Sequence, residues 1–169
     1  MSAFLDEIET HVPALRRYAR ALTHDVDSAD DLVQDCLERA IRKRSLWRPT
    51  GPLRAWLFRI LLNVYRNDLR RRRRALPPRQ LDSRFVEPVS FPGHYGSLAL
   101  AETARAMQAL PSEQREALLL VAVEGMSYAE AAGVLGIPSG TLMSRLARAR
   151  AALRRATTDD DGPRLRTVK

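Results

Sequence analysis

The sequence holds a single cysteine, three histidines and no long hydrophobic run. One cysteine, Cys36, excludes an intramolecular disulfide, and its apolar neighbours favour a buried side chain over a reactive thiol. The histidines (His11, His24 and His94) lack the spacing of metal ligands, so no zinc site and no other cofactor is expected. No apolar run approaches the ~18 residues of a membrane helix. The acidic start of the chain differs from a signal peptide, and we expect a cytoplasmic protein without membrane insertion.

Aromatic residues make up only 6% of the 169 residues, and runs of β-branched residues are scarce as well. Ala, Leu, Arg and Glu dominate instead. These residue types favour helices, so an all-α fold is predicted. A chain of this length can form one medium-sized domain or two small ones.

Charge is unevenly distributed along the chain. The formal net charge is +8, with basic residues concentrated in Arg70–Arg74 and Arg145–Arg155 and acidic residues clustered in Asp25–Glu38. The excess of positive charge alone fits either an ordinary basic protein or one that binds a polyanion. Because the two signs are separated, we expect two surfaces with different partners.

The first zone, residues 4–74, has a helical period throughout. A first helix is predicted there, with Pro13 marking a break or a late start. Asp27 or Ser28 is expected to cap a second helix that runs to about Arg44. A loop with two prolines and a glycine follows, and a third helix is predicted from Leu53 to Arg74. Its expected buried stripe is Trp56, Ile60, Val64 and Leu69, widened by Leu57 and Leu61.

Residues 76–97 hold several prolines and glycines and have no sustained period. A loop of this length is uncommon inside one compact domain, so a flexible linker is predicted. It would join a domain of residues 1–75 to one of residues 98–156, and residues 157–169 are expected to be a disordered tail. Fully extended at about 3.3 Å per residue, the linker could span roughly 75 Å, which is about two turns of DNA at ~34 Å each.

The clearest signal lies between Met126 and Leu153, where a helix-turn-helix is predicted. Ser127 can cap the first helix with Glu130 as its capping-box partner, and Gly136 suits the left-handed turn after it. Ser139 can cap the second helix. That helix has an apolar face for packing on the domain: Leu142, Leu146, Ala149 and Leu153.

The opposite face of this second helix suits a DNA groove. Arg145 and Arg148 can each fork onto a guanine, whereas Thr141 and Ser144 suit phosphates or a thymine methyl group. With Ser139, these residues are the candidate DNA contacts. The alternative interpretation is an amphipathic helical hairpin with solvated arginines.

Three segments of the chain resemble one known family. Residues Tyr128–Ala132 and Gly136–Arg150 look like the promoter-reading domain of the extracytoplasmic-function sigma factors, within the sigma-70 superfamily. Residues Asp30–Ala40 resemble the polymerase-binding helix of the family, and Arg54–Arg70 resemble its promoter-melting helix. The three motifs occur in the family's order and cover most of the chain except the linker and the tail.

The resemblance implies roles for surfaces already described. The acidic face of the second helix would dock on core RNA polymerase (β and β′ subunits), although a solvated helix face is the alternative. Its residues are Asp31, Gln34, Asp35 and Glu38. The helix-turn-helix would read the upstream (−35) promoter element. The family also implies an anti-sigma factor that holds the protein inactive.

The front of the third helix would lie along the opening downstream (−10) element, through Asn63, Arg66, Asn67 and Arg70. The loop carrying Trp47 and Arg48 would receive a flipped base of the non-template strand, which favours the open form of the DNA. The alternative for Trp47 is a core anchor. The run Arg70–Arg74 would add salt-sensitive attraction to phosphates.

The function that follows is an alternative sigma factor without catalytic activity or a small-molecule substrate, which directs polymerase to promoter DNA and helps open it. A free-standing helix-turn-helix regulator is the main alternative, but no heptad seam for dimerisation is present and the N-terminal zone would be unexplained. A nucleic-acid-processing enzyme would need a catalytic cluster, and none is evident.

Overall fold

The structure is a computed structural model that describes residues 2–47, 51–75 and 98–158. These residues form helices and connecting turns, without strands, so the predicted all-α class is confirmed. In the N-terminal half (residues 2–75) the elements are α1 (Ser2–Thr23), α2 (Val26–Arg42), the short 3-10 turn η1 (Arg44–Leu46) and α3 (Leu53–Ala75). In the C-terminal half (residues 98–158) they are α4 (Leu98–Ala109), α5 (Ser112–Leu118), the π-helical turn η3 (Leu119–Val123), α6 (Tyr128–Leu135) and α7 (Ser139–Thr158).

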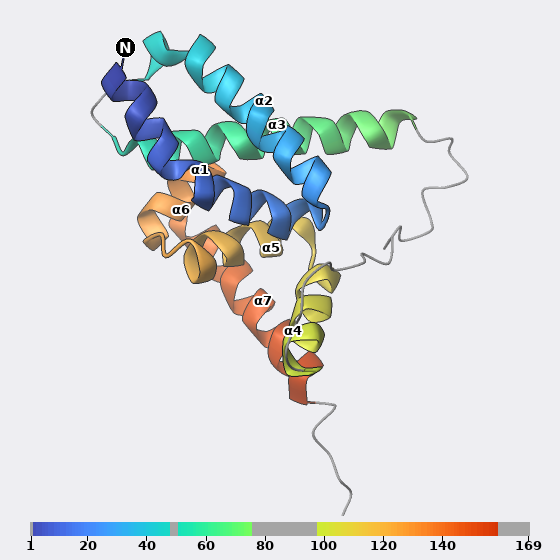
Figure 1. Ribbon diagram of the computed structural model, residues 1–169. Helices are drawn as coiled ribbons and strands as arrows, with labels where there is room; N and C mark the ends of the chain where they lie inside the picture. The colour runs from blue at the N-terminus through green and yellow to red at the C-terminus, as the bar shows by residue number, and fades with distance from the viewer. Residues whose placement is uncertain (1, 48–50, 76–97, 159–169) are drawn as a thin grey trace, which may run out of the picture.

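The N-terminal half packs α1 and α2 side by side over α3 (Figure 1). Tyr18 of α1 and Phe58 of α3 are fully buried at its centre, with ring centroids 5.2 Å apart in an edge-to-face arrangement. Cys36 is also fully buried and its thiol donates to the carbonyl oxygen of Leu57. Burial raises the pKa of Cys36 to about 12. The interpretation of this cysteine as a small core residue is therefore confirmed.

Two predicted helix boundaries in this half were wrong. Pro13 lies inside α1, which continues through it, because the apolar residues on both sides of it are held in one core. Helix α2 begins at Val26 and its cap is Asp25, whose carboxylate accepts a hydrogen bond of 2.8 Å from the Ser28 backbone N–H. Hydrogen bonding from the Ser28 side chain, and then from its backbone N–H, lowers the pKa of Asp25. Helix α2 ends at Arg42, since the chain then tightens into η1.

The buried stripe of α3 also differs from the prediction. The side chains that α3 buries are Leu53, Leu57, Phe58, Leu61, Leu62, Val64 and Tyr65. Trp56, Ile60 and Leu69 are only partly buried. Helix α3 packs against α2 on one side and against α6 of the C-terminal half on another. Because of these two contacts, its buried face is wider than the predicted stripe and is rotated relative to it.

The C-terminal half contains the predicted helix-turn-helix, formed by α6 and α7. Ser127 and Glu130 make the predicted capping box, and Gly136 has the predicted left-handed conformation with φ 67°. Leu142, Leu146 and Ala149 are buried as predicted. Ser139 is not the cap of α7 but its first residue, because the first hydrogen bond of the helix runs from Leu142 N–H to the Pro138 carbonyl, at 3.1 Å.

At its other end α7 reaches Thr158, two residues beyond the predicted limit at 156. The predicted linker and the rest of the predicted tail lie outside the described residues.

The two halves pack on each other, which the sequence did not predict. One hydrophobic core runs through both halves and includes Tyr18 of α1 and Leu120 of η3. The Tyr18 hydroxyl donates to the Glu116 carbonyl oxygen at 3.1 Å, and Arg59 donates to the Gly133 carbonyl oxygen at 2.7 Å. In Figure 1 the C-terminal half lies beneath α1 and α3. The two helical domains predicted from the sequence are therefore also in contact with each other.

Candidate nucleic-acid interface

The front of α7 is exposed for most of its predicted length. Ser139, Thr141, Ser144 and Arg148 are exposed, as is Met143, which sequence reasoning did not select. Arg145 is much less exposed than these residues. Its side chain is only 19% exposed and its guanidinium lies 3.1 Å from the Glu113 carboxylate of α5. Position 145 lies at the edge of the apolar face of α7, so its side chain is turned toward α5 rather than to the front.

One exposed arginine of α7 was missed as a candidate. Arg150 donates to the Tyr128 hydroxyl at 3.3 Å and thereby joins α7 to the start of α6. Two sequence signals included it: its place in the basic stretch 145–155, and its place at the end of the segment Gly136–Arg150 that resembles the promoter-reading domain. The hydrogen bond orients a positive charge beside the helix-turn-helix, where a DNA phosphate can be bound.

The surface of α3 is divided between solvent and the C-terminal half. Asn63, Asn67 and Arg70 are exposed. Arg66 faces the C-terminal half instead, and its Nη2 and Nε atoms lie 2.6 and 3.2 Å from Glu116 Oε2. This hydrogen bonding raises the pKa of Arg66 above its ordinary value. The predicted set therefore contains three exposed side chains and one that is engaged within the chain.

The loop predicted to hold an unpaired base is described only in part. Trp47 packs against Phe4 of α1 with ring centroids 5.5 Å apart. The side chain is half-buried, and its Nε1 has no hydrogen-bond partner among the described residues. Arg48 lies outside the described residues. The contact with Phe4 supports the interpretation of Trp47 as a core anchor, and leaves its contact with a base as a prediction.

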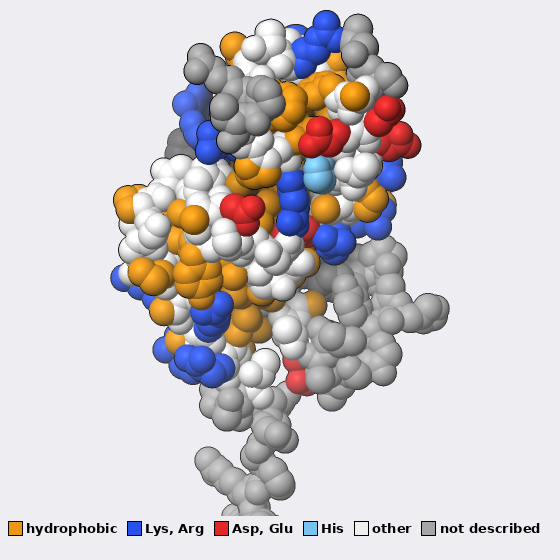
Figure 2. Space-filling view, turned by 90° about the vertical axis from the view of Figure 1, so that its left-hand side faces the viewer, with side chains coloured by type: hydrophobic (Ala, Val, Ile, Leu, Met, Phe, Trp, Pro, Cys, Tyr) orange, Lys and Arg blue, Asp and Glu red, His pale blue; other side chains and the backbone are white. Residues whose placement is uncertain are grey.

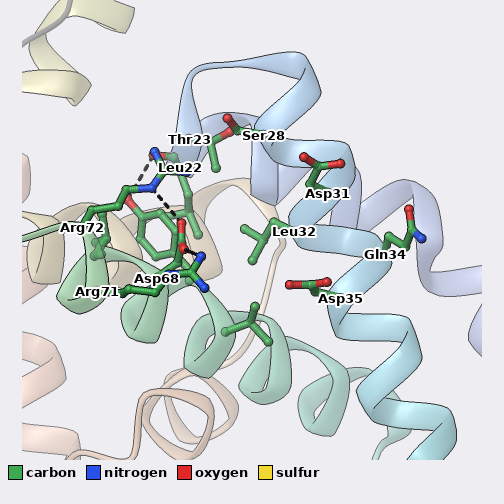
Figure 3. A pocket seen from close by; sticks show the side chains of 13 residues that line it. Leu22, Thr23, Ser28, Asp31, Leu32, Gln34, Asp35, Asp68, Arg71 and Arg72 are labelled. Carbon is green, nitrogen blue, oxygen red and sulfur yellow. Dashed lines mark hydrogen bonds and ion pairs between the residues drawn. The ribbon is translucent and has the colours of Figure 1, made fainter. Parts of the chain in front are cut away.

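The outer face of α2 carries the predicted acidic residues. Asp31, Gln34, Asp35 and Glu38 are all exposed, and the Gln34 amide donates to the Glu38 carboxylate at 3.2 Å. Asp31, Gln34 and Asp35 line a pocket between α2 and α3 (Figure 3). On its α3 side Asp68 pairs with Arg71 and Arg72, at 2.5 and 2.9 Å. Two arginines of the run Arg70–Arg74 are therefore paired with Asp68 of the same helix.

Ion pairs between the halves are the main feature that sequence reasoning missed. Glu124, whose side chain is fully buried at the end of η3, binds Arg17 of α1 through both oxygens at 2.7 and 3.0 Å. Arg54 of α3 donates to the Glu124 backbone carbonyl and lies 3.2 Å from its carboxylate. The partners are 107 and 70 residues apart, so no local spacing could have indicated them.

His24 sits in the turn between α1 and α2, in the left-handed region with φ 57°, and its Nε2 lies 3.2 Å from Arg115 Nη1 of α5. Burial, and then the charge of Arg115, lowers the pKa of His24 from 6.5 to about 4. Between pH ~6.5 and pH ~4 the His24 imidazole is therefore protonated in the unfolded chain and neutral in the folded protein. Stability contributed by neutral His24 is complete above pH ~6.5 and is lost as the pH falls toward ~4.

We expect His24→Asn to fold, since Asn tolerates a positive φ, and to reduce the loss of thermal stability between about pH 7 and about pH 5. Melting temperatures of both proteins across this range provide the measurement. His11, whose pKa burial also lowers, remains in both proteins as an internal control. An equal fall in the two proteins would show that His24 does not take up the proton.

One face of the molecule carries hydrophobic and basic side chains side by side, with acidic ones in smaller groups (Figure 2). Exposed hydrophobic residues include Val123 and Tyr128 near the helix-turn-helix. Among the described residues no cluster of His, Cys, Asp and Glu could hold a metal ion. Within the same residues, no helix is both long and apolar enough to cross a membrane.

Comparison with known families gives one match in each half of the chain. Residues 8–62 match the family described as the Sigma2 domain of PhyR. Residues 100–153 match Sigma-70, region 4. The second match contains the helix-turn-helix.

Several curated relatives cover nearly the whole chain. The ECF RNA polymerase sigma factor EcfG of Rhodopseudomonas palustris is 42% identical over 149 residues, which are 88% of this chain and 81% of the relative. The ECF RNA polymerase sigma factor SigM of Mycobacterium tuberculosis is 37% identical over 90% of this chain and 76% of its own length.

A solved structure is also similar over both halves. The sigma factor RpoE of Bartonella quintana, in complex with the anti-sigma factor NepR, superposes with a TM-score of 0.82 at 38% identity, over 95% of this chain and 99% of its own. CnrH in complex with the cytosolic domain of CnrY superposes with a TM-score of 0.69 at 34% identity, over 95% of this chain and 90% of its own.

Proposed function

Because the chain belongs to the family of ECF RNA polymerase sigma factors, we propose that three of its surfaces divide the contacts with polymerase and promoter. The protein is an alternative sigma factor regulated by an anti-sigma factor. The domain limits are part of the proposal: residues 1–75 for polymerase and the −10 element, and residues 98–156 for the −35 element. The relatives are transcription factors. We propose that this chain has no catalytic activity of its own and acts in the cytoplasm, where polymerase transcribes.

The acidic face of α2 is proposed as the docking surface for core RNA polymerase. Its residues Asp31, Gln34, Asp35 and Glu38 are all exposed on one helix. The chain is otherwise basic, with a net charge of +8. Concentrated negative charge repels DNA and attracts a basic protein surface, so this face favours the polymerase over the promoter.

The −10 element is proposed to lie along α3. Asn63, Asn67 and Arg70 are exposed there, and amide and guanidinium groups bind bases and phosphates well. Arg66 would join them once released from Glu116. Trp47 and Arg48 are proposed to lie beside the same strand.

The −35 element is proposed to bind the front of α7 through Ser139, Thr141, Ser144 and Arg148. Arg145 stays in the set, although it must leave Glu113 to reach a base. A helix with one face on its domain and a polar face to solvent matches the way a recognition helix enters the major groove.

The observation that carries this proposal is the presence of an exposed acidic face on α2 and an exposed polar front on α7 in separate halves of one chain. Run-off transcription with purified core polymerase tests it. A promoter-specific transcript that depends on the added protein is the expected result. If no such transcript formed, and the protein alone instead protected a palindromic operator, the chain would be a free-standing regulator.

Arg148 offers a direct test of the −35 contact, because it is exposed and lies on the proposed front. Arg148→Ala is expected to weaken promoter binding by the holoenzyme by ~1–3 kcal/mol and to relax the preference at one −35 position. Arg155→Ala, at the exposed far end of the same helix, is the matched control. Binding measured on a series of −35 variants gives the result. An unchanged preference would remove Arg148 from the base-reading set.

A further inference from the structure

The polar front of α7 contains one large apolar side chain. Met143 is 52% exposed, more than any other large hydrophobic residue among the described side chains of the C-terminal half. Its neighbours Ser144 and Arg148 are exposed and polar. A single exposed hydrophobic residue is ordinary on a protein surface. Met143, however, lies within the surface that we propose for the −35 element, so its contact there needs a chemical account.

Met143 is joined by a second apolar side chain. Ala147 lies four residues further along α7 and is exposed as well. Residues four apart are neighbours on the surface of a helix, so Met143 and Ala147 form a small apolar patch. Arg148 follows Ala147 directly and is exposed beside it. A helix that enters the groove with Arg148 therefore carries this apolar patch with it.

The chemistry of the major groove restricts what the apolar patch can meet. Every base pair presents hydrogen-bonding atoms there, but thymine alone adds an apolar group, its C5 methyl. A methionine pressed against a polar base atom would displace water without replacing the hydrogen bond, which is destabilising. Against the methyl group, both partners lose apolar surface to water, which is favourable. The patch thus favours thymine and disfavours the other bases.

Arg150 lies on the same side of α7 as Met143. The two are seven residues apart, and at about 100° per residue their directions differ by only ~20°. The Tyr128 hydroxyl holds the Arg150 guanidinium at 3.3 Å, which orients it for a DNA phosphate. Phosphate contacts set the position of a protein on the duplex. The unbranched, flexible side chain of Met143 can then reach the base edges from this side of the front.

We propose that Met143, supported by Ala147, is a specificity-determining residue that reads the C5 methyl group of a thymine in the −35 element. This inference rests on the proposed binding of α7 to that element and adds one base to what is read. Five residues of a helix span about 7.5 Å, which is about two base pairs at ~3.4 Å each. The thymine is therefore expected within about two base pairs of the position that Arg148 reads.

The test uses the holoenzyme and a promoter that it transcribes in the run-off assay. Each thymine of the −35 element, on either strand, is replaced in turn by deoxyuridine, which lacks the C5 methyl and keeps every hydrogen-bonding atom. Promoter affinity is measured for the wild type, Met143→Gln and Met143→Leu. Gln matches Met in length and helix propensity but ends in a polar group, whereas Leu stays apolar. Leu5→Gln is the control, at a 40% exposed position of α1.

We expect one deoxyuridine to weaken binding of the wild type by about fourfold, which corresponds to ~0.8 kcal/mol for one buried methyl group. Met143→Gln should bind the thymine promoter at least as weakly as that and should not respond to deoxyuridine at the same position. Met143→Leu should keep the response, because it still offers an apolar contact. Leu5→Gln should behave as the wild type does.

Two results would overturn the inference. If the wild type responded to no deoxyuridine, or if the element held only G·C pairs, no thymine methyl would be read. If Met143→Gln kept the full response, another residue would read the methyl group and Met143 would be a solvated surface residue. Should Met143→Gln fail to fold, Met143→Ala takes its place, because it also removes the contact.

Replacing the whole −35 element separates this inference from the proposed function. A holoenzyme whose promoter affinity ignored that replacement would show that α7 does not read the −35 element at all. An element that is required, but whose thymine methyl groups have no effect, would contradict only the role of Met143.

Discussion

Replacing Phe58 with alanine is expected to lower the free energy of unfolding by ~3–5 kcal/mol. The side chain is fully buried in α3, its ring meets Tyr18 edge-to-face at 5.2 Å, and the Arg54 guanidinium lies 5.6 Å above it. Alanine would leave a cavity in the core between α1 and α3. Because Tyr18 and Arg54 also contact the C-terminal half, the loss would affect both halves.

Urea unfolding at constant pH measures this change. Leu46→Ala is the matched control, because Leu46 is 69% exposed and exposed substitutions usually stay within ±0.5 kcal/mol. A loss below about 1 kcal/mol for Phe58→Ala would show that the core closes over the gap, and would contradict the central position assigned to this ring.

Reversing one charge on the acidic face of α2 is expected to have the largest effect on function. Asp35→Arg would place a positive charge where we propose that a basic polymerase surface docks, and like charges across an interface cost several kcal/mol. A cost of about 2.8 kcal/mol corresponds to a roughly 100-fold weaker affinity. The stability of the free protein should change little, since Asp35 is exposed.

Binding of labelled protein to core RNA polymerase provides the measurement. Glu9→Arg is the control, because it makes the same change of charge at an exposed position on α1. If the two variants bound polymerase equally well, the acidic face would be a solvated helix surface, the alternative that the sequence left open.

Features that depend on neighbouring residues could be predicted from the sequence. The capping box of Ser127 and Glu130, the left-handed Gly136 and the apolar face of α7 all follow from local spacing, and the structure confirms them. The buried state of Cys36 was predicted from its apolar neighbours in the same way.

Features that depend on distant partners could not be predicted. Pro13 stays helical because the core holds α1 on both sides of it. The sequence predicts Arg66 as a DNA contact, but in the structure its guanidinium binds Glu116, which lies 50 residues away along the chain. Similarly, Arg145 faces Glu113 of a helix whose position no periodicity reveals. Each of these outcomes is decided by tertiary packing.

The direction in which Glu124 points depends on the number of residues in the π-helical turn η3. Its hydrogen bond from the Glu124 N–H to the Leu119 carbonyl accommodates one residue more than an α-helical turn does. In a regular α-helix each residue turns the chain by about 100°. Loss of one residue from 119–123 would therefore convert η3 into a regular α-helical turn and keep Glu124 directed toward Arg17 and Arg54, whereas one added residue would turn the Glu124 carboxylate away from them. In the evolution of this protein, one-residue deletions in η3 should be tolerated more readily than insertions.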